Sequence, residues 1–325
     1  MAKKTWLRYF KLTVQMASGS ESAIDLSDFR VKFHVTQAIT GRPSTAEITV
    51  YNVSDETSNR IEVPANAAVN DRQLRVILEA GYQSNHGVIF QGDLWWKSSG
   101  RESETETFMR LIASTGDRAY QYGVVNQSFP AGATQGDELE AVIKAMTEKG
   151  IGSAGTPALA KEALPRGKVM YGMARDALQD VADANGLLYA YTDRGIRFSP
   201  KQGEDKAESG RVIVLNAASG LLDRPVLTVN GVQVKALLNP ELEVGRIIQI
   251  DQSSLQNQDW STAYAEMNYA ATEQMMNADG LYTVYSREFT GDTRGDDWYS
   301  DLVCTAYNNE LGAITPNFTQ CLPNQ

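Results

Sequence analysis

The feature that most constrains this chain is an alternation of apolar and polar side chains that recurs near both of its ends. In residues 29–35 (FRVKFHV) every second side chain is apolar, and residues 45–51 (TAEITVY) repeat the pattern. A period of two residues is typical of antiparallel strands that bury one face. Further strands are expected at residues 9–14, 74–80, 88–95, 107–113, 211–215, 226–228, 231–238, 246–250, 281–290 and 298–305. The pattern therefore predicts a β-dominated chain.

The middle of the chain has a different period. In residues 135–149 the apolar side chains recur at intervals of three and four, at Leu139, Val142, Ile143 and Met146. This spacing indicates an amphipathic helix, and Thr134 is placed to cap it. A second helix is expected at residues 173–185, followed by a hairpin over residues 187–199. Together these elements predict a small α/β module.

The order of the strands indicates an internal repeat. In the first third, a strand ending in Gly92-Asp93 is followed by a polar turn and another strand, and the same order surrounds Gly291-Asp292. We therefore predict an α+β fold in which two copies of one β module flank the α/β insert. For 325 residues the expected domains are 1–125, 126–203 and 204–325.

The charge of the chain is unevenly distributed. The net charge is -10, and residues 204–325 hold 7 basic and 17 acidic side chains, which is the whole imbalance. Nucleic-acid binding needs clustered cations, so this composition argues against it. Two interpretations stay open: a solvated acidic face, or a surface kept negative so that a polyanion passes without binding. No apolar run reaches the ~18 residues that span a membrane.

Motifs for catalysis or cofactor binding are weak. Residues 150–155 match G-x-G-x-x-G, but a predicted helix rather than a strand precedes them, which favours a plain loop. His34 and His86 have no partners at metal-ligand spacing. The carboxylates in residues 288–301 are interleaved with arginines, which favours a salt-bridged turn over a pair of acid–base catalysts. We therefore predict no enzyme activity, no cofactor and no metal.

Two tryptophans and two cysteines complete the set of candidates. Trp95 and Trp96 end a predicted strand, where alternation sends one ring inward and the other outward. The outward ring is a candidate for partner contact, and plain packing is the alternative. Cys304 and Cys321 are too few for a disulfide scaffold, and the sequence leaves open whether they pair.

Several stretches resemble a known family. Residues 221–225 (LLDRP), 231–242 (GVQVKALLNPEL), 244–246 (VGR) and 291–299 (GDTRGDDWY) resemble the baseplate hub proteins of contractile-tailed bacteriophages. Residues 29–52, which contain TGRPSTAEITVYN, are similar to the start of the same family.

The resemblance implies a structural virion protein of the tail baseplate, assembled in the host cytoplasm. It implies a homotrimer in which each subunit supplies two tail-tube-like β-barrel domains, so that three chains form a pseudo-hexameric ring. This hub would join the sixfold tail tube to the threefold spike. The implied partners are the spike, the tail tube or its distal initiator, baseplate wedge proteins and a tape-measure protein in the lumen. DNA would pass without specific binding, and no membrane insertion is expected.

The resemblance also selects residues for an architectural or interface role. They are Asn239, Pro240, Gly245 and Arg246 in one turn, and Gly291, Asp292, Arg294, Gly295 and Trp298 in another. In the second of these turns, Gly291 and Gly295 are expected to supply unusual backbone angles, and Arg294 to bind neighbouring carboxylates. The alternative functions are a tail-associated cell-wall hydrolase and a carbohydrate-binding module that stacks sugars on Trp95, Trp96 and Trp260.

Overall fold

Most of the chain forms strands. The computed structural model describes residues 7–15, 23–61, 63, 74–157, 159, 161–201, 212–228, 231–250, 256–257 and 280–307. The first third holds β1 (Arg8–Gln15), β2 (Ile24–Asp25), β3 (Val31–Ala38), β4 (Thr45–Tyr51), α1 (Asp55–Arg60), β5 (Arg75–Tyr82), β6 (Asn85–Arg101) and β7 (Thr107–Ser114). The last third holds β12 (Ile213–Leu215), β13 (Val226–Thr228), β14 (Gly231–Leu237), β15 (Ile247–Ile250), β16 (Gln256–Asn257), β17 (Leu281–Asp292) and β18 (Trp298–Ala306).

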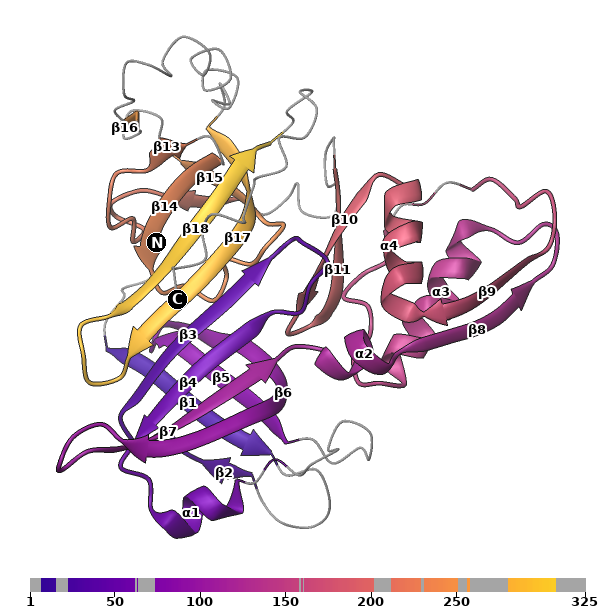
Figure 1. Ribbon diagram of the computed structural model, residues 1–325. Coiled ribbons are helices and arrows are strands. Elements are labelled where there is room, and N and C mark those ends of the chain that lie inside the picture. Colours follow the sequence, from indigo (N-terminus) through magenta and orange to yellow (C-terminus); the bar gives the residue numbers. More distant parts are fainter. Residues whose placement is uncertain are drawn as a thin grey trace, which may run out of the picture.

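The middle third forms an insert that lies to one side of these strands (Figure 1). Its elements are α2 (Asp117–Tyr122), β8 (Val124–Phe129), α3 (Gln135–Thr147), β9 (Lys168–Met173), α4 (Ala174–Ala184), β10 (Leu187–Thr192) and β11 (Gly195–Pro200). The predicted helices are confirmed. Thr134 and Asp137 form a reciprocal capping box at the start of α3, which satisfies two backbone N–H groups that a helix start leaves unpaired. The insert is thus the α/β module that the sequence indicates.

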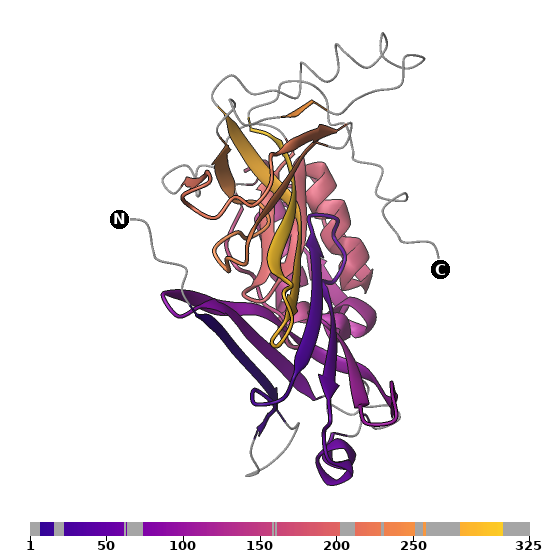
Figure 2. The ribbon, with the colours of Figure 1, turned by 90° about the vertical axis from the view of Figure 1, so that its left-hand side faces the viewer.

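One large mixed sheet joins the two ends of the chain. Its strand order is β16-β13-β14-β18-β17-β3-β4-β7-β6-β5-β1-β2, with β12 and β15 attached beside β17. Figures 1 and 2 show the yellow β17–β18 hairpin running alongside the indigo strand β3. The pairing runs from Ser286 opposite Ala38 to Asp292 opposite Lys32. The fold is therefore a β-dominated α+β fold, as predicted.

The pairing differs from the expected pair of closed barrels. Across the described residues the strand order ends at β2 and at β16 and does not return on itself. The reason is that β3, with β4 on one side, takes β17 from the last third on its other side. Alternation in a sequence fixes which face of a strand is buried, but it does not fix which strand lies beside it.

The expected repeat is present in strand order but not in every detail. In each of the sets β5–β6–β7 and β15–β17–β18, the middle strand pairs antiparallel with the other two. Asp292 ends β17 as predicted, but Gly92 and Asp93 lie in the middle of β6, which continues to Arg101. A Cβ on Gly92 would lie 2.6 Å from both Phe90 Cζ and the Ser114 backbone oxygen. This glycine therefore permits close packing rather than a turn.

The two ends of the chain also share one core. The first core is built from β1 to β7, yet Leu238, Phe289 and Trp298 of the last third pack into it. A second core lies among the strands of the last third, and a third fills the insert around α3 and α4.

No helix of the described residues is long and apolar enough to cross a bilayer. The sequence also predicts a helix within residues 261–277, which lie outside the described residues.

We expect Phe289→Ala to destabilise both ends of the chain together. Phe289 belongs to β17 but is fully buried in the core of the first third. Loss of a buried phenyl ring costs about 3–5 kcal/mol of the free energy of unfolding, measured by urea denaturation. Phe108→Ala, on the opposite sheet face, is the control and should cost less than about 1 kcal/mol. Two separate transitions, of which only one shifts, would contradict the shared core.

Candidate functional site

The turn between β17 and β18 is tied to the first third of the chain by an ion pair. Asp292 ends β17 and is only 4% exposed. Arg30, 262 residues away and just before β3, donates from Nη2 to Asp292 Oδ2 at 2.9 Å. The Arg294 backbone N–H donates to Asp292 Oδ1 at 2.9 Å, whereas its guanidinium donates to the Asp28 backbone oxygen at 3.2 Å. The prediction that the Arg294 side chain binds this carboxylate is wrong, because Arg30 binds it.

Two further contacts hold the same turn. Arg8 of β1 donates to the backbone oxygens of Asp292, at 3.1 Å, and of Gly295. Its guanidinium carbon lies 5.2 Å from the ring centroid of Trp298, a distance at which a cation is attracted to the π face. The buried Trp298 Nε1–H donates to the Gly81 backbone oxygen at 3.1 Å. The turn therefore contacts β1, β5 and the start of β3.

The two glycines of this turn are required because there is no room for a side chain, not because of their backbone angles. A Cβ on Gly291 would lie 2.6 Å from Phe33 Cε1 and 2.9 Å from Trp298 Cε3. A Cβ on Gly295 would lie 2.7 Å from Asp292 Oδ2. Neither glycine has a positive φ, so the expectation of unusual angles is wrong at these two positions.

The environment of Asp292 sets its protonation. Burial alone raises the pKa of this carboxyl, but hydrogen bonds from Arg30 and from the Arg294 backbone N–H, together with the nearby charge of Lys32, outweigh it. The pKa therefore lies below its ordinary value of 3.8, and Asp292 is a carboxylate at neutral pH. The ion pair with Arg30 is complete under those conditions.

The second predicted turn lies where β14 leaves the sheet. The Asn239 Oδ1 accepts from Asn85 Nδ2 at 3.0 Å, and the Asn239 backbone N–H donates to Ser300 Oγ at 3.3 Å. Pro240 lies against Gly87 of β6, where an added Cβ would be 3.5 Å from the proline ring. Asn239 and Pro240 therefore connect the last third to the β5–β6 turn.

The other half of this turn contacts the insert. Gly245 has a φ of 78°, which lies in the left-handed region that favours glycine. An added Cβ would lie 2.7 Å from Ser199 Oγ of β11, so the position also lacks space. The Gly245 N–H donates to the Val284 backbone oxygen at 2.8 Å, and Arg246 Nη1 donates to the Glu241 backbone oxygen at 2.8 Å. The turn therefore contacts β17 through Gly245 N–H, lies against β11 of the insert, and is closed by the hydrogen bond from Arg246 to Glu241.

A buried arginine beside this turn was not selected from the sequence. Arg287 of β17 is 2% exposed and donates from Nη1 to the Leu242 backbone oxygen at 3.0 Å. Burial lowers the pKa of Arg287 to about 10, and the charges of Asp193 and Glu243 oppose that shift. Its Nη2 lies 3.9 Å from Asp193 Oδ1 in the insert hairpin. No local pattern marks it, because its partners come from distant segments.

Trp95 and Trp96 do not follow the predicted alternation. Both rings are exposed, by 51% and 41%. The pairing of β6 with β7 shifts between Leu94 and Trp96, and such a β-bulge adds one residue that has no opposite partner. The prediction that one ring points inward is therefore wrong. Trp96 lies opposite Ile112, on the polar face of the sheet.

The face of the sheet opposite the cores is polar and crosses both ends of the chain. Cross-strand neighbours on this face form one row of Lys235, Asp301, Glu288, Thr36 and Thr45, and another of Tyr299, Thr290, His34, Glu47, Ile112 and Trp96. A shallow hollow of about 480 Å³ lies on it around Lys32, His34, Glu47 and Arg110. Arg110 Nε lies 3.1 Å from Glu47 Oε1. The face is therefore continuous from β14 to β7.

Titratable groups do not gather into a metal centre in the part of the chain that the structure describes. His34 contacts Thr36 and Thr290, and lies 3.7 Å from Glu288. Cys304 is buried, and desolvation raises the pKa of its thiol. Cys321 and Trp260 lie outside the described residues, so pairing of the two cysteines and sugar stacking on Trp260 stay predictions.

The fold is shared with phage tail proteins. The 43 kDa tail protein of prophage MuSo2 from Shewanella oneidensis is 6% identical, with a TM-score of 0.54 over 92% of this chain and 97% of that one. A tail protein from Neisseria meningitidis MC58 is 10% identical, with a TM-score of 0.53 over 91% and 96%. A type VI secretion component of E. coli is 9% identical, with a TM-score of 0.51 over 92% and 78%.

At these identities the likeness is one of fold alone. The family described as baseplate hub gp41 matches residues 9–264, and the chain belongs to that family. The match confirms the resemblance indicated by residues 29–52 and 231–242, and it stops before the turn at 291–299. Membership makes the chain a structural component of a tail baseplate. No curated protein matches it in sequence.

We expect Asp292→Asn to reduce stability at neutral pH but not in acid. A carboxyl whose pKa falls on folding stabilises the folded state above 3.8, and this stabilisation disappears as the pH falls through the lower folded value. Loss of a charged hydrogen-bond acceptor costs about 1–3 kcal/mol. Urea denaturation should show this gap at pH 7 and a smaller gap near pH 3. Asp296→Asn, in the same turn, is the control; a gap independent of pH would contradict the ion pair.

We expect Arg287→Gln to cost about 2–4 kcal/mol of unfolding free energy, because it leaves Asp193 and the Leu242 carbonyl without their buried cation. Arg194 lies 3.1 Å from Glu243 but is 71% exposed, so Arg194→Gln should cost less than about 1 kcal/mol. Thermal and urea denaturation of the two variants test the difference. An equal loss of unfolding free energy in the two variants would contradict the argument that the buried arginine contributes more to stability.

Proposed function

We propose that the chain is the central hub of a phage tail baseplate, a homotrimeric ring that joins the sixfold tail tube to the threefold spike. The observation that carries this proposal is the polar sheet face, which continues without interruption across both ends of the chain. In the ring, this face lines the channel for the tape-measure protein and the genome. The cores and the insert lie behind it.

The charge of the polar face suits a channel that does not hold DNA. Its described charged side chains include the cations Lys32, Arg110 and Lys235 and the anions Glu47, Glu288, Asp301 and, opposite Lys32, Asp292. DNA affinity grows with the number of phosphates that a protein neutralises, and this face supplies no excess cations. The acidic excess expected to repel DNA lies partly outside the described residues, so its role stays a prediction.

The strand sets support the ring symmetry. Because β5–β6–β7 and β15–β17–β18 share one strand order, three chains would present six similar units toward a sixfold tube. In this proposal residues 1–125 and 204–325 form the two tube-like domains, and residues 126–203 lie at the periphery. The turns at Asn239–Arg246 and Gly291–Trp298 hold these parts in one body. Spike, tube initiator and wedge proteins are the proposed partners.

The trimer is tested by mass in solution. Sedimentation equilibrium of the purified chain, alone and with the spike protein of the same phage, should give a species of three times the chain mass in at least one condition. A chain that stays monomeric in both conditions would contradict the ring.

The channel is tested by placing cations on the polar face. Glu47 and Glu288 are about half exposed, so Glu47→Lys with Glu288→Lys should alter charge without unfolding the sheet. We expect normal numbers of tailed particles and slower DNA ejection, with the delay decreasing at high salt because added cations bind phosphate. Asp180→Lys on the exposed side of α4 is the matched control. Ejection that is unchanged, or slowed equally by the control, would contradict the channel assignment.

A further inference from the structure

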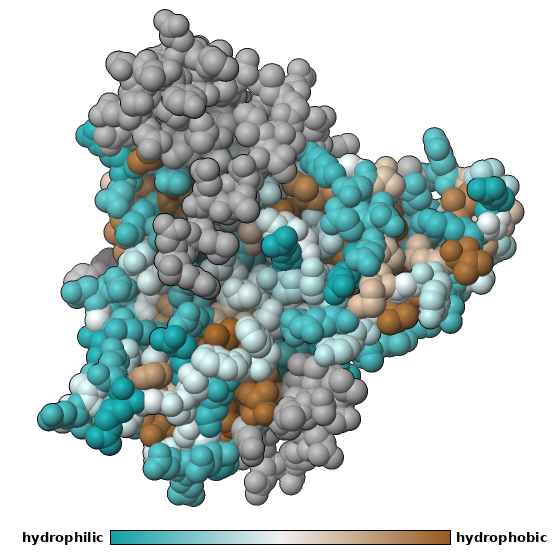
Figure 3. All heavy atoms as spheres, viewed as in Figure 1, coloured by the Kyte–Doolittle hydropathy of each residue, from teal (hydrophilic) through white to brown (hydrophobic). Residues whose placement is uncertain are grey.

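The insert carries a two-stranded ribbon, β8 paired with β9, whose two faces differ. One face packs on the helices through Val125, Phe129 and Met170. The other face is open to solvent, with Val169 exposed by 70% and Tyr171 by 79%. Figure 3 shows apolar atoms at the surface of this part of the insert. Exposed apolar side chains on a short ribbon are typical of a surface that contacts another chain.

The outer edge of β8 has backbone groups available for pairing. Within the described part of the chain, β8 pairs with β9 alone. The Ala174 N–H donates to the Gly123 oxygen, so Gly123 is a hydrogen-bonded position of this antiparallel pair. Hydrogen-bonded and non-hydrogen-bonded positions alternate along such a pair, so every second residue from Val124 onward points its N–H and C=O groups away from β9. These residues are Val124, Asn126 and Ser128. A strand edge of this kind is a template for an added strand.

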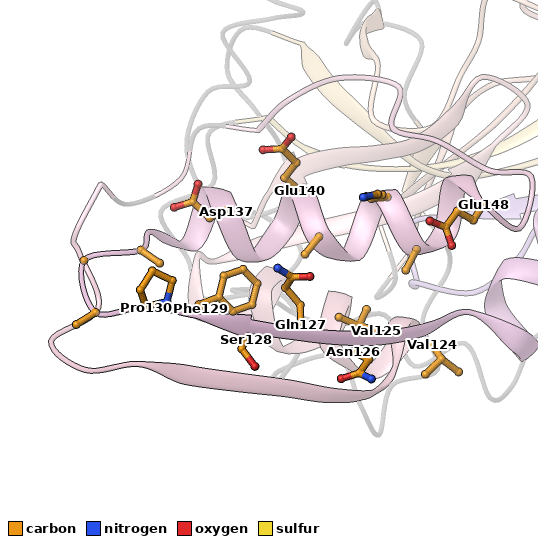
Figure 4. A pocket seen from close by; sticks show the side chains of 16 residues that line it. Val124, Val125, Asn126, Gln127, Ser128, Phe129, Pro130, Asp137, Glu140 and Glu148 are labelled. Carbon is orange, nitrogen blue, oxygen red and sulfur yellow. The ribbon is translucent and has the colours of Figure 1, made fainter.

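A groove runs along this edge between β8 and α3. It has a volume of about 890 Å³ and is lined by residues 124–133 and by one side of the helix (Figure 4). Ala141 and Ala145 present only methyl groups to it, which leaves room for a backbone beside β8. The charged side chains along the helix side of the groove are Asp137, Glu140, Glu148 and Lys144. The groove is therefore open to a strand and negative overall.

We propose that β8 accepts an extended segment of a different polypeptide as an added strand, with basic and apolar side chains in alternation. Successive side chains of a strand point to opposite faces. One set would face the carboxylates of Glu140 and Glu148, which favours Lys or Arg. The other set would lie on the solvent face beside Val124, which favours apolar residues. A second copy pairing through the same edge is a poorer occupant, because it would bring the carboxylates of two negative grooves together.

The test uses the full chain and a capped, fluorescent peptide of sequence Lys-Val-Lys-Thr-Lys-Val-Lys. Fluorescence anisotropy should show saturable binding, and hydrogen exchange should slow in the segment 124–129 when the peptide is added. N-methylation of every second peptide amide removes its donors to β8 and should weaken binding at least about tenfold. Glu140→Lys with Glu148→Lys should weaken it by about tenfold or more, and Asp176→Lys on α4 should change it by less than about twofold.

Three results would overturn the proposal. Absence of saturable binding to the folded chain is one. Equal affinity for the N-methylated peptide is another, because it would indicate charge attraction without strand addition. The third concerns the chain without peptide. If hydrogen exchange of the 124–129 amides is slow at high protein concentration and becomes fast on dilution, a second copy of the chain occupies the groove. Each result is independent of the proposed channel, because β8 belongs to the insert and the channel is assigned to the polar face of the large sheet.

Discussion

The pairing of β3 with β17 is the interaction on which the rest of the structure depends. It joins segments of the first and last thirds through one antiparallel ladder that ends at Asp292 opposite Lys32. Closing a loop of that length has an entropic cost that grows only with the logarithm of its length, so a ladder, a shared core and a buried ion pair suffice to offset it. Without this pairing, Phe289 and Trp298 would lose the core in which they are buried.

The two turn motifs act at the two ends of this pairing. The turn at Gly291–Trp298 contacts β1, β5 and the start of β3 through Arg8, the Gly81 carbonyl and Arg30. The turn at Asn239–Arg246 contacts the β5–β6 turn and, through Gly245, the insert. Each therefore joins parts that are distant in the sequence. This explains how a chain without a catalytic motif comes to have sharply defined polar turns.

The sequence was a good guide where local patterns decide the structure. Alternation correctly placed Val31, Phe33 and Val35 in the core, and the helical period correctly located α3. It failed at Trp95, where a bulge interrupts the alternation. It also missed Arg30 and Arg287, because an arginine in or beside a strand has no local signal for a partner that is distant in the sequence. Closure into barrels failed for the same reason, since neighbours in a sheet are chosen by long-range packing.

The open ends of the sheet connect the fold to assembly. Within the described residues, segment 24–27 covers Leu12, Thr13 and Val14 of β1, so the start of that strand lies at an edge. Such an edge invites pairing with another chain, and proteins that remain single usually protect it with charge. Arg8 is instead directed to the β17–β18 turn, which leaves Lys11 as the exposed cation along β1. An edge with so little protection is costly for a solitary molecule and would be useful in the proposed ring, where each copy could cover the edge of the next.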